Sequence, residues 1–431
     1  MMLTLYRTLT TFGGPVIQYY LKRRMAAGKE DPYRFAERQG KSTRRRPNGS
    51  LIWLHAASVG ESLSMLPIID TLLEANSQLH VLMTTGTVSS AALMADRLPE
   101  RAIHQYVPVD RAAYVRQFLS HWSPDLALWA ESEFWPNLVM ETQRRNVPMI
   151  LVNGRISPKS FDGWQWFPGV IGQLLRGFTL CLGQTDDDAD RLRQLGALNH
   201  KCLGNLKFAV PPLPADTEEL IRLEQQISGR PRWLAASTHP GEEEMGGQVH
   251  AKIAAGHPGL LTIIVPRHAN RGGDIAARLR SEGFVSAQRS RQETITPDTQ
   301  IYVADTMGEL GLFYRLSDIV FMGKSLVPLG GQNPLEALQI GCAVVHGPHM
   351  ANFKKITEEM AKTGSALSVR SSDELASAVE TLLRDDVKRG SLIENGREYM
   401  TSHSQVVERV SHEILLVLNT NITEKSPHAA A

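Results

Sequence analysis

The feature that most constrains the fold is a repeated alternation between short apolar runs and amphipathic stretches. Such runs, separated by helical patterns, are typical of βαβ units, whose parallel strands are covered by helices on both faces. The sequence therefore predicts an α/β protein with two successive doubly wound, Rossmann-like parallel sheets. The predicted strands of the first series are 51–54, 79–83, 126–129, 149–152 and 180–182, and those of the second are 233–236, 261–265, 301–304, 318–321, 343–346 and 366–369.

A proline-rich segment, 210–216 (VPPLPAD), separates the two series. Its three prolines cannot donate backbone hydrogen bonds, so we expect an interdomain linker here. Two doubly wound domains joined by a hinge would form a ligand cleft where the carboxyl ends of both sheets face each other. The expected organisation is a basic arm (1–46), a first α/β domain (47–209), a linker (210–231), a second α/β domain (232–419) and a frayed tail (420–431).

Charge and cysteine content exclude several classes of protein. The 46 Lys and Arg residues almost balance the 45 Asp and Glu residues, so the chain lacks the positive field that a nucleic-acid-coating protein needs. The three cysteines are scattered and contain no C-x-x-C pair. This argues against a disulfide framework and a zinc ribbon, and it favours a reducing compartment.

The N-terminal 46 residues combine a mildly apolar stretch with a basic one. Arg7 interrupts the apolar part, which is shorter than the ~20 residues that a membrane-spanning helix needs. No signal-peptide cleavage pattern follows it. Between residues 22 and 46, ten Lys or Arg face only three acidic residues. Aromatic residues beside a basic run suit a surface of anionic headgroups, with the body of the protein on the cytoplasmic side, but a solvated basic arm is an equal alternative.

The first candidate for chemistry is Glu61, in the string HAASVGE (55–61) directly after a predicted strand. A carboxylate at a helix N-terminus above a cleft can act as a general base if desolvation raises its pKa. The alternative is that Glu61 only complements the helix dipole.

Two further candidates lie at strand ends of the first series. Glu131 and Glu133 follow the strand that ends at residue 129, and their spacing predicts that both carboxylates point the same way. Such a pair suggests glycoside hydrolysis or metal binding, but two acids alone make a poor metal site, and acidic residues at a helix start are the plain alternative. Lys207 precedes the linker, where it would bind an anion or simply be solvated.

The second series carries three polar loops at strand ends, namely 265–268, 305–310 and 330–336. Glycines in the last loop allow backbone amides to approach a ligand, and the following helix would direct its positive end at a phosphate. Asn333 and Glu336, with a proline between them, also fit a capping box, and both interpretations can hold together. The sequence contains neither a P-loop nor G-x-G-x-x-G, which disfavours nucleoside triphosphate hydrolysis and hydride transfer.

In order along the chain, these strings resemble those of the 3-deoxy-D-manno-octulosonic acid (Kdo) transferases. The resemblance runs from the N-terminal segment to about residue 410. The matching strings are HAASVGE (55–61), ESEFWPN (131–137), NGRIS (153–157), GNLKF (204–208), VPRH (265–268), DTMGEL (305–310), GGQNPLE (330–336) and GPHMANFK (347–354).

The resemblance implies a glycosyltransferase-B fold in an enzyme at the cytoplasmic face of the inner membrane. It implies CMP-Kdo as donor and a lipid A precursor as acceptor. Helix amides and Arg267 could neutralise the single phosphate and the carboxylate of this donor without a divalent ion, so we expect no metal and no cofactor, and the net charge argues against nucleic acid as a partner. Glu61 would be the general base, and Glu131 and Lys207 would support the transition state. CMP would be bound by Pro266, Arg267, Met307, Gly308, Glu309, Asn333, Pro334, Leu335 and Glu336.

Two residues depart from the family pattern. Gln332 stands where a histidine is usual, and Lys324 stands where a glycine is common, which puts the details of donor binding in question. Two other classes remain open: a different nucleotide-sugar transferase or epimerase of the same fold, or a non-catalytic nucleotide-binding membrane scaffold.

Overall fold

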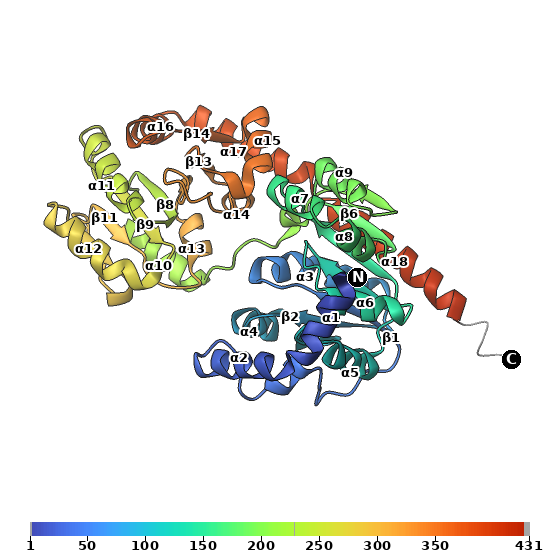
Figure 1. Cartoon of the computed structure of the whole chain (residues 1–431). Coiled ribbons are helices and arrows are strands. Elements are labelled where there is room, and N and C mark those ends of the chain that lie inside the picture. Colours follow the sequence, from blue (N-terminus) through green and yellow to red (C-terminus); the bar gives the residue numbers. More distant parts are fainter. Residues whose placement is uncertain (1, 228, 426–431) are drawn as a thin grey trace. The chain divides into compact units, whose positions relative to one another are not determined.

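A computed structural model describes residues 2–227 and 229–425, which form two compact α/β units (Figure 1). Unit 1 comprises Met1–Val210 and His403–Ala431, and unit 2 comprises Pro211–Ser402. Each unit contains one seven-stranded parallel sheet. The predicted α/β class with two parallel sheets is therefore confirmed.

The sheet of unit 1 has the order β3-β2-β1-β4-β5-β6-β7. Ile52 and Leu54 of its central strand pack into one apolar cluster, while Leu51 and Trp53 pack into another, so helices cover both faces. The strands are β1 (Ser50–His55), β2 (Leu79–Thr85), β3 (Ala102–Tyr106), β4 (Leu126–Ala130), β5 (Met149–Gly154), β6 (Leu180–Gly183) and β7 (His200–Cys202). The helices are α1 (Met2–Phe12), α2 (Gly14–Ala26), η1 (Phe35–Gln39), α3 (Val59–Ala75), α4 (Val88–Arg97), α5 (Ala112–Trp122), α6 (Pro136–Arg144), α7 (Pro158–Gln165), α8 (Pro168–Leu175), α9 (Asp186–Gln194), η2 (Leu206–Ala209) and α18 (Val406–Lys425).

The sheet of unit 2 has the order β10-β11-β9-β8-β12-β13-β14, with the same reversal of strand order beside its first strand, β8. Its strands are β8 (Arg232–Thr238), β9 (Leu261–Pro266), β10 (Ser286–Gln288), β11 (Ile301–Val303), β12 (Ile319–Met322), β13 (Ala343–His346) and β14 (Ala366–Ser368). Its helices are α10 (Thr217–Ile227), α11 (Glu242–Ile253), η3 (Ala254–Gly256), η4 (Ala269–Arg271), α12 (Gly272–Ser281), η5 (Arg289–Arg291), α13 (Leu310–Arg315), α14 (Leu335–Ile340), η6 (Ala351–Phe353), α15 (Lys354–Thr363), α16 (Ser372–Arg384) and α17 (Asp386–Ser402).

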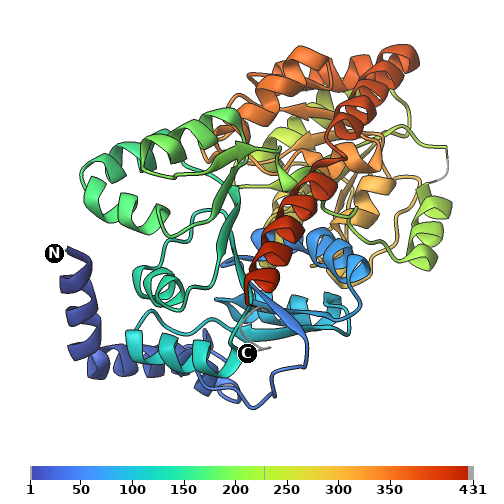
Figure 2. The same cartoon turned by 90° about the vertical axis from the view of Figure 1, so that its right-hand side faces the viewer.

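The sequence predicts that residues 403–419 belong to the second domain, but the structure assigns them to unit 1. Helix α18 returns to unit 1 and lies against α3 (Figure 2). Four of its side chains join the apolar cluster that also contains Ile52, and each is at most 2% exposed: Val406, Val410, Ile414 and Leu418. This spacing of four residues explains the assignment, because it places all four side chains on one face of the helix.

Two other expected boundaries also change. The expected linker 210–231 contains α10, whose Leu223 and Ile227 are buried in unit 2, so only its first part is extended. The expected frayed tail begins at 420, but α18 continues to Lys425. Residues 426–431 lie outside the described residues.

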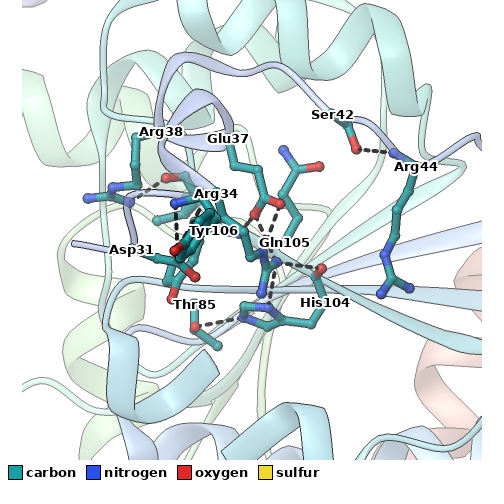
Figure 3. A network of polar contacts seen from close by, with 12 residues as sticks. Asp31, Arg34, Glu37, Arg38, Ser42, Arg44, Thr85, His104, Gln105 and Tyr106 are labelled. Carbon is teal, nitrogen blue, oxygen red and sulfur yellow. Dashed lines mark hydrogen bonds and ion pairs between the residues drawn. The ribbon is translucent and has the colours of Figure 1, made fainter. Parts of the chain in front are cut away.

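The N-terminal segment is not a separate arm, because η1 docks on the sheet-edge strand β3 (Figure 3). Arg34 binds Glu37 at 2.9 Å and donates to the backbone oxygen of His104, also at 2.9 Å. Glu37 in turn accepts the backbone N–H of Tyr106 at 2.7 Å. Burial, reinforced by the charges of Arg34 and Arg44, lowers the pKa of His104 to about 3, so this ring stays neutral. These contacts satisfy polar groups at the strand edge that would otherwise remain unpaired.

Several of the basic residues between 22 and 46 are therefore structural rather than free. Arg24 and Arg38 both bind the buried carboxylate of Glu30, at 2.7 and 3.2 Å, and Arg46 binds Asp125 at 3.3 Å. This segment therefore has fewer free positive charges than its composition suggests. Among the described helices, none is both long and apolar enough to cross a membrane.

A candidate glycosyl-transfer site

The candidate catalytic residues of unit 1 gather where the strand order of its sheet reverses. Strands β2 and β4 flank β1, so the chain leaves in opposite directions after β1 and after β4. The carboxyl edge between two such strands is the usual ligand-binding crevice of a doubly wound sheet. Glu61 lies in the first turn of α3, the helix after β1, and Glu131 directly follows β4.

Glu61 is held at the start of α3 by its own loop. Its Oε2 accepts the backbone N–H of Ala57 at 2.8 Å, and its Oε1 accepts the hydroxyl of Ser58 at 2.8 Å. Ser58 is also the N-cap of α3, since its Oγ accepts the N–H of Glu61. The capping role is thus real, and it fixes the rotamer of the carboxylate that a general base would need.

Burial raises the pKa of Glu61, and the neighbouring charges of Glu131 and Glu133 raise it further. The hydrogen bonds from Ala57 and Ser58 act in the opposite direction. A half-buried carboxylate with a raised pKa is suited to take up a proton transiently.

Glu131 forms an ion pair with Lys207, whose Nζ lies 3.0 Å from Oε1. Glu131 has a left-handed backbone (φ 55°) and donates its N–H to the carbonyl of Val152 at 2.9 Å. On the other side, Asn205 accepts the N–H of Lys207 at 3.0 Å and so fixes the short helix η2. The structure therefore joins two predicted site residues that lie far apart in the sequence.

Glu133 does not pair with Glu131 in the way the sequence predicted. Strand β4 ends at Ala130, so the alternation of a strand does not extend to these two residues. Glu133 instead accepts the indole N–H of Trp135 at 2.8 Å. His55, at the start of the same motif as Glu61, is buried, and its pKa is lowered to about 4, which makes it a neutral core residue.

In unit 2 the strand order reverses between β8 and β12, and a buried glutamate organises the loops there. Glu242 is 1% exposed and accepts four backbone N–H groups, from His239, Lys324, Ser325 and Leu326. These bonds hold Lys324 in a left-handed conformation with φ 61°. A glycine would adopt this conformation without the strain that a lysine bears.

A group of basic side chains surrounds this crevice: His239, Arg267, His268 and Lys324, which we call the basic cluster. The rings of His239 and His268 lie 5.7 Å apart, and Gln332 lies 3.4 Å from Nε2 of His239. Burial is the main cause that lowers the pKa of His239. The neighbouring groups Lys324, His268 and Arg267 lower this pKa further by electrostatic repulsion. Together these groups form a positive site suited to an anion.

His239 is not among the site residues predicted from the sequence. It lies in the string STHPGE (237–242), directly after a predicted strand, and Ser237 has φ 54°. A polar loop after the first strand of a doubly wound sheet was the signal that could have revealed it.

The loop Met307–Gly308–Glu309 has a more structural role than expected. Glu309 binds the guanidinium of Arg289, which also binds Glu219 of α10. Its carboxylate is therefore already engaged, and the Arg289 side chain lowers its pKa. Met307 is 72% exposed, and Gly308, which has φ 85°, is exposed as well, so this part of the loop is accessible to solvent.

The loop 330–336 is close-packed rather than open. A Cβ atom on Gly331 would lie 2.3 Å from Sδ of Met350, and the φ of 77° at this residue also favours glycine. Asn333 accepts the N–H of Leu335 at 3.2 Å and donates to Glu336 at 3.2 Å.

The expected capping box is therefore only partly formed. Helix α14 begins at Leu335, one residue after Pro334, and Glu336 binds the side chain of Asn333 rather than a backbone N–H. Burial raises the pKa of Glu336, while the nearby charge of Arg267 opposes that rise. Pro266 and Leu335, both expected to contact CMP, are buried residues.

Within residues 2–227 and 229–425, no group of three or more His, Cys, Asp or Glu side chains could hold a metal ion.

Comparisons with known proteins identify the family. Residues 33–210 match the family model described as 3-deoxy-D-manno-octulosonic-acid transferase (kdotransferase). The "Probable 3-deoxy-D-manno-octulosonic acid transferase, mitochondrial" of Arabidopsis thaliana is 36% identical, over 97% of this chain and 94% of its own length. The 3-deoxy-D-manno-octulosonic acid transferase of Rickettsia bellii is 31% identical, over 97% of this chain and 99% of its own length.

Solved structures of proteins with much lower sequence identity share the fold. The UDP-GlcNAc 2-epimerase of Neisseria meningitidis is similar with a TM-score of 0.60, over 85% of this chain and 99% of that chain, at 12% identity. Identity at this level reports the fold and not the reaction. The sequence relatives decide the family, and this chain belongs to the 3-deoxy-D-manno-octulosonic acid transferases, which are glycosyltransferases.

Proposed function

We propose that this chain transfers Kdo from CMP-Kdo to a lipid A precursor in lipopolysaccharide biosynthesis. The observation that carries the proposal is the convergence of Glu61 and the Glu131–Lys207 ion pair at the strand reversal of unit 1, in a member of this family. The two units would act as the acceptor-binding and donor-binding halves of a glycosyltransferase-B enzyme, with Glu61 on the acceptor side.

In the proposed reaction, Glu61 removes the proton from an acceptor hydroxyl. The resulting oxygen attacks the anomeric carbon of Kdo, the bond from that carbon to the phosphate oxygen breaks, and CMP leaves with the electron pair. A single base on the acceptor side suffices for such an inverting displacement. The raised pKa of Glu61 supports this role because proton transfer is favoured when the pKa of the base approaches the working pH.

The Glu131–Lys207 pair would stabilise charge in the transition state. A lysine ammonium held by a carboxylate has a fixed position, so it costs little reorganisation when negative charge develops nearby. The left-handed backbone of Glu131 and the cap on η2 both contribute to that rigidity.

The basic cluster of unit 2 would bind the donor. CMP-Kdo carries a phosphate and a carboxylate, and Arg267 and Lys324 supply two positive charges near His239. Fixed cations can neutralise a leaving phosphate, which is the role that a divalent ion has in other nucleotide-sugar enzymes. We place the cytidine near the exposed residues Met307 and Gly308 and the loop 330–336.

We further propose that α1 and α2 lie on the cytoplasmic face of the inner membrane. Six apolar side chains recur at intervals of three and four residues across the two helices, and each is at least 50% exposed: Met2, Leu5, Leu9, Phe12, Val16 and Tyr19. Two exposed cationic residues, Lys22 and Arg23, follow this apolar stripe in the chain. An amphipathic surface with cations at its end suits an anionic membrane, which the lipid acceptor would share.

The test is mass spectrometry of the product formed from CMP-Kdo and a lipid A precursor. An increase in acceptor mass by Kdo residues, lost in Glu61→Gln, would support the proposal. Turnover of CMP-Kdo without acceptor modification, or transfer from a uridine diphosphate sugar instead, would contradict it.

A further inference from the structure

The end of β5 contacts both segments that carry the Glu131–Lys207 ion pair. The carbonyl of Val152 accepts the N–H of Glu131 at 2.9 Å. The next residue, Asn153, accepts the N–H of Leu206 at 3.0 Å through its side-chain Oδ1. Leu206 directly precedes Lys207 in η2. Two consecutive residues of one strand therefore hold the backbone segments on either side of a charge pair whose members lie far apart in the sequence.

The backbone conformation of Asn153 directs its side chain toward η2. Strand alternation would turn Asn153 to the same face of the sheet as Leu151, which belongs to one apolar cluster, whereas Leu206 belongs to the other cluster together with Val152. The alternation is interrupted here, because Asn153 has φ 57° and the register between β5 and β6 shifts between Leu151 and Gly154. Asparagine adopts this left-handed conformation more readily than most residues. The irregular strand end thus brings Oδ1 within reach of η2.

The contact with Leu206 leaves Asn153 only partly satisfied. Asn153 is 2% exposed. Within the described ranges 2–227 and 229–425, its Nδ2 atom has no hydrogen-bond partner. The fold gains a partner for the N–H of Leu206, which is fully buried, but it leaves a buried donor unpaired, and these two effects on stability oppose each other. The fixed position of η2 is therefore the main consequence of this contact.

Helix η2 depends on such side-chain contacts. It is only four residues long, so few backbone bonds of its own keep it in place. Two successive N–H groups at its start, those of Leu206 and Lys207, bind the side-chain oxygens of Asn153 and Asn205, both at 3.0 Å. The bond from Asn153 is the one that reaches the helix from the sheet, since Asn205 belongs to the same segment as η2. The position of Lys207 relative to the sheet therefore depends on Asn153.

The end of β5 also acts on Glu131 through β6. The carbonyl of Gly154 accepts the N–H of Gln184, which follows β6, at 2.9 Å. Nε2 of Gln184 lies 3.4 Å from Oε1 of Glu131, the same oxygen that binds Lys207 at 3.0 Å. The carboxylate and the ammonium are thus both held from one strand end.

We propose that Asn153 is a positioning residue for the transfer reaction, which holds η2 so that the ammonium of Lys207 stays in place beside Glu131. The inference rests on the function proposed above for Lys207. Asn153 acts through Lys207 and needs no contact with either substrate. A fixed cation stabilises developing charge only at the correct distance, so loss of this contact should lower kcat and leave the KM for the donor nearly unchanged.

The experiment is a double-mutant cycle at positions 153 and 207, measured by steady-state kinetics of Kdo transfer. Asn153→Gly removes the acceptor for Leu206, and glycine adopts a φ of 57° without strain. We expect kcat to fall about 10-fold and the KM for CMP-Kdo to stay within about two-fold. In a Lys207→Met background the same substitution should change kcat by less than about two-fold, because the group that Asn153 positions is then absent. Asn153→Asp keeps an acceptor oxygen and should retain more turnover than Asn153→Gly.

Asn199→Gly is the matched control. It also removes one asparagine side-chain hydrogen bond within unit 1, from Nδ2 to the carbonyl of Thr179 at 3.0 Å, but at the amino-terminal ends of β6 and β7. It should leave kcat within about two-fold, and melting temperatures show that each variant is folded at the assay temperature.

A purely structural role of Asn153 would lower kcat by the same factor in both backgrounds, and that result would overturn the proposal. A kcat of Asn153→Gly equal to that of Asn199→Gly would overturn it as well, as would an Asn153→Asp variant no more active than Asn153→Gly. Failure of the proposed function gives a different result, because the unaltered chain would then transfer no Kdo, or Lys207→Met would transfer it at the normal rate.

Discussion

The Nζ atom of Lys207 lies 3.0 Å from Oε1 of Glu131, which joins the segment before the second unit to the loop after β4. Both side chains are largely shielded, with 23 and 18% of their surface exposed. The pair is therefore a fixed charge arrangement inside unit 1 rather than a solvated surface contact.

Lys207→Met should lower kcat by about 100-fold or more, because it removes a positioned cation and leaves the Glu131 carboxylate without its cationic partner. Lys207→Arg keeps the charge and should retain a larger part of the activity. The measurement is the steady-state rate of Kdo transfer, with melting temperature as a check of folding. Equal activity of the methionine and arginine variants would show that the charge has no role in the reaction.

Glu61→Gln should lower turnover by at least about 100-fold while the fold and CMP binding persist. Glutamine can still accept the N–H of Ala57, so the start of α3 should remain intact. Calorimetric titration with CMP and the rate of transfer separate the two properties. Near-normal turnover would restrict Glu61 to capping the helix.

The pH dependence follows from the raised pKa of Glu61. A general base must be ionised, so the rate should rise with pH through a value above the ordinary 4.5. The hydroxyl of Ser58 lowers this pKa, and Ser58→Ala should therefore shift the acid limb of the rate profile to higher pH. A shift to lower pH would contradict the assigned hydrogen bond.

The same pKa predicts a stability effect. A folded-state pKa above the unfolded value means that Glu61 favours the folded state when protonated and that this contribution is lost as pH rises. The difference in unfolding free energy between Glu61→Gln and the unaltered chain should therefore favour the variant more at neutral pH than at acidic pH. Urea unfolding at two pH values measures the difference. An advantage of the variant that grows toward acidic pH would reverse the expected sign.

Arg267→Ala should weaken CMP binding by about 10-fold and leave acceptor binding unchanged, because its charge belongs to the basic cluster. Lys388→Ala removes an equal charge from α17 and serves as the control. Calorimetric titration with CMP compares the two. Equal losses in both variants would mean that only the net charge of unit 2 matters.

Ile414→Ala should destabilise unit 1 by about 2–5 kcal/mol, since Ile414 is fully buried in its core. Leu416→Ala in the same helix is the matched control, because Leu416 is 50% exposed. Chemical unfolding followed by tryptophan fluorescence measures both, because six of the seven tryptophans lie in unit 1. Similar losses in the two variants would mean that α18 does not use the face described.

Local sequence pattern predicted the buried strands because a strand covered on both faces is a continuous apolar run. The missed strands β3, β7 and β10 lie toward the sheet edges and contain polar residues, such as His104 and Gln105 in β3. No local property of Val410 or Ile414 states which of the two sheets helix α18 covers.

The candidate site also has features that local sequence predicts and features that depend on the fold. Glu61 and Glu131 could be proposed because each follows an apolar run. That they lie beside adjacent strands depends on the strand order, in which β4 pairs with β1. The contact of Lys207 with Glu131 and the four amides on Glu242 depend on segments distant in the sequence, and no spacing rule contains them.

The return of α18 to unit 1 has a consequence for the order in which the protein forms during synthesis. Unit 2 is one uninterrupted stretch, Pro211–Ser402, whereas the core of unit 1 needs side chains from Val406 to Leu418 that leave the ribosome after it. The unit that begins first is thus completed last, against the usual N-to-C order of domain folding. Until α18 arrives, the nascent chain carries an open apolar groove along α3, and this stage is the one at which a chaperone would have most to protect.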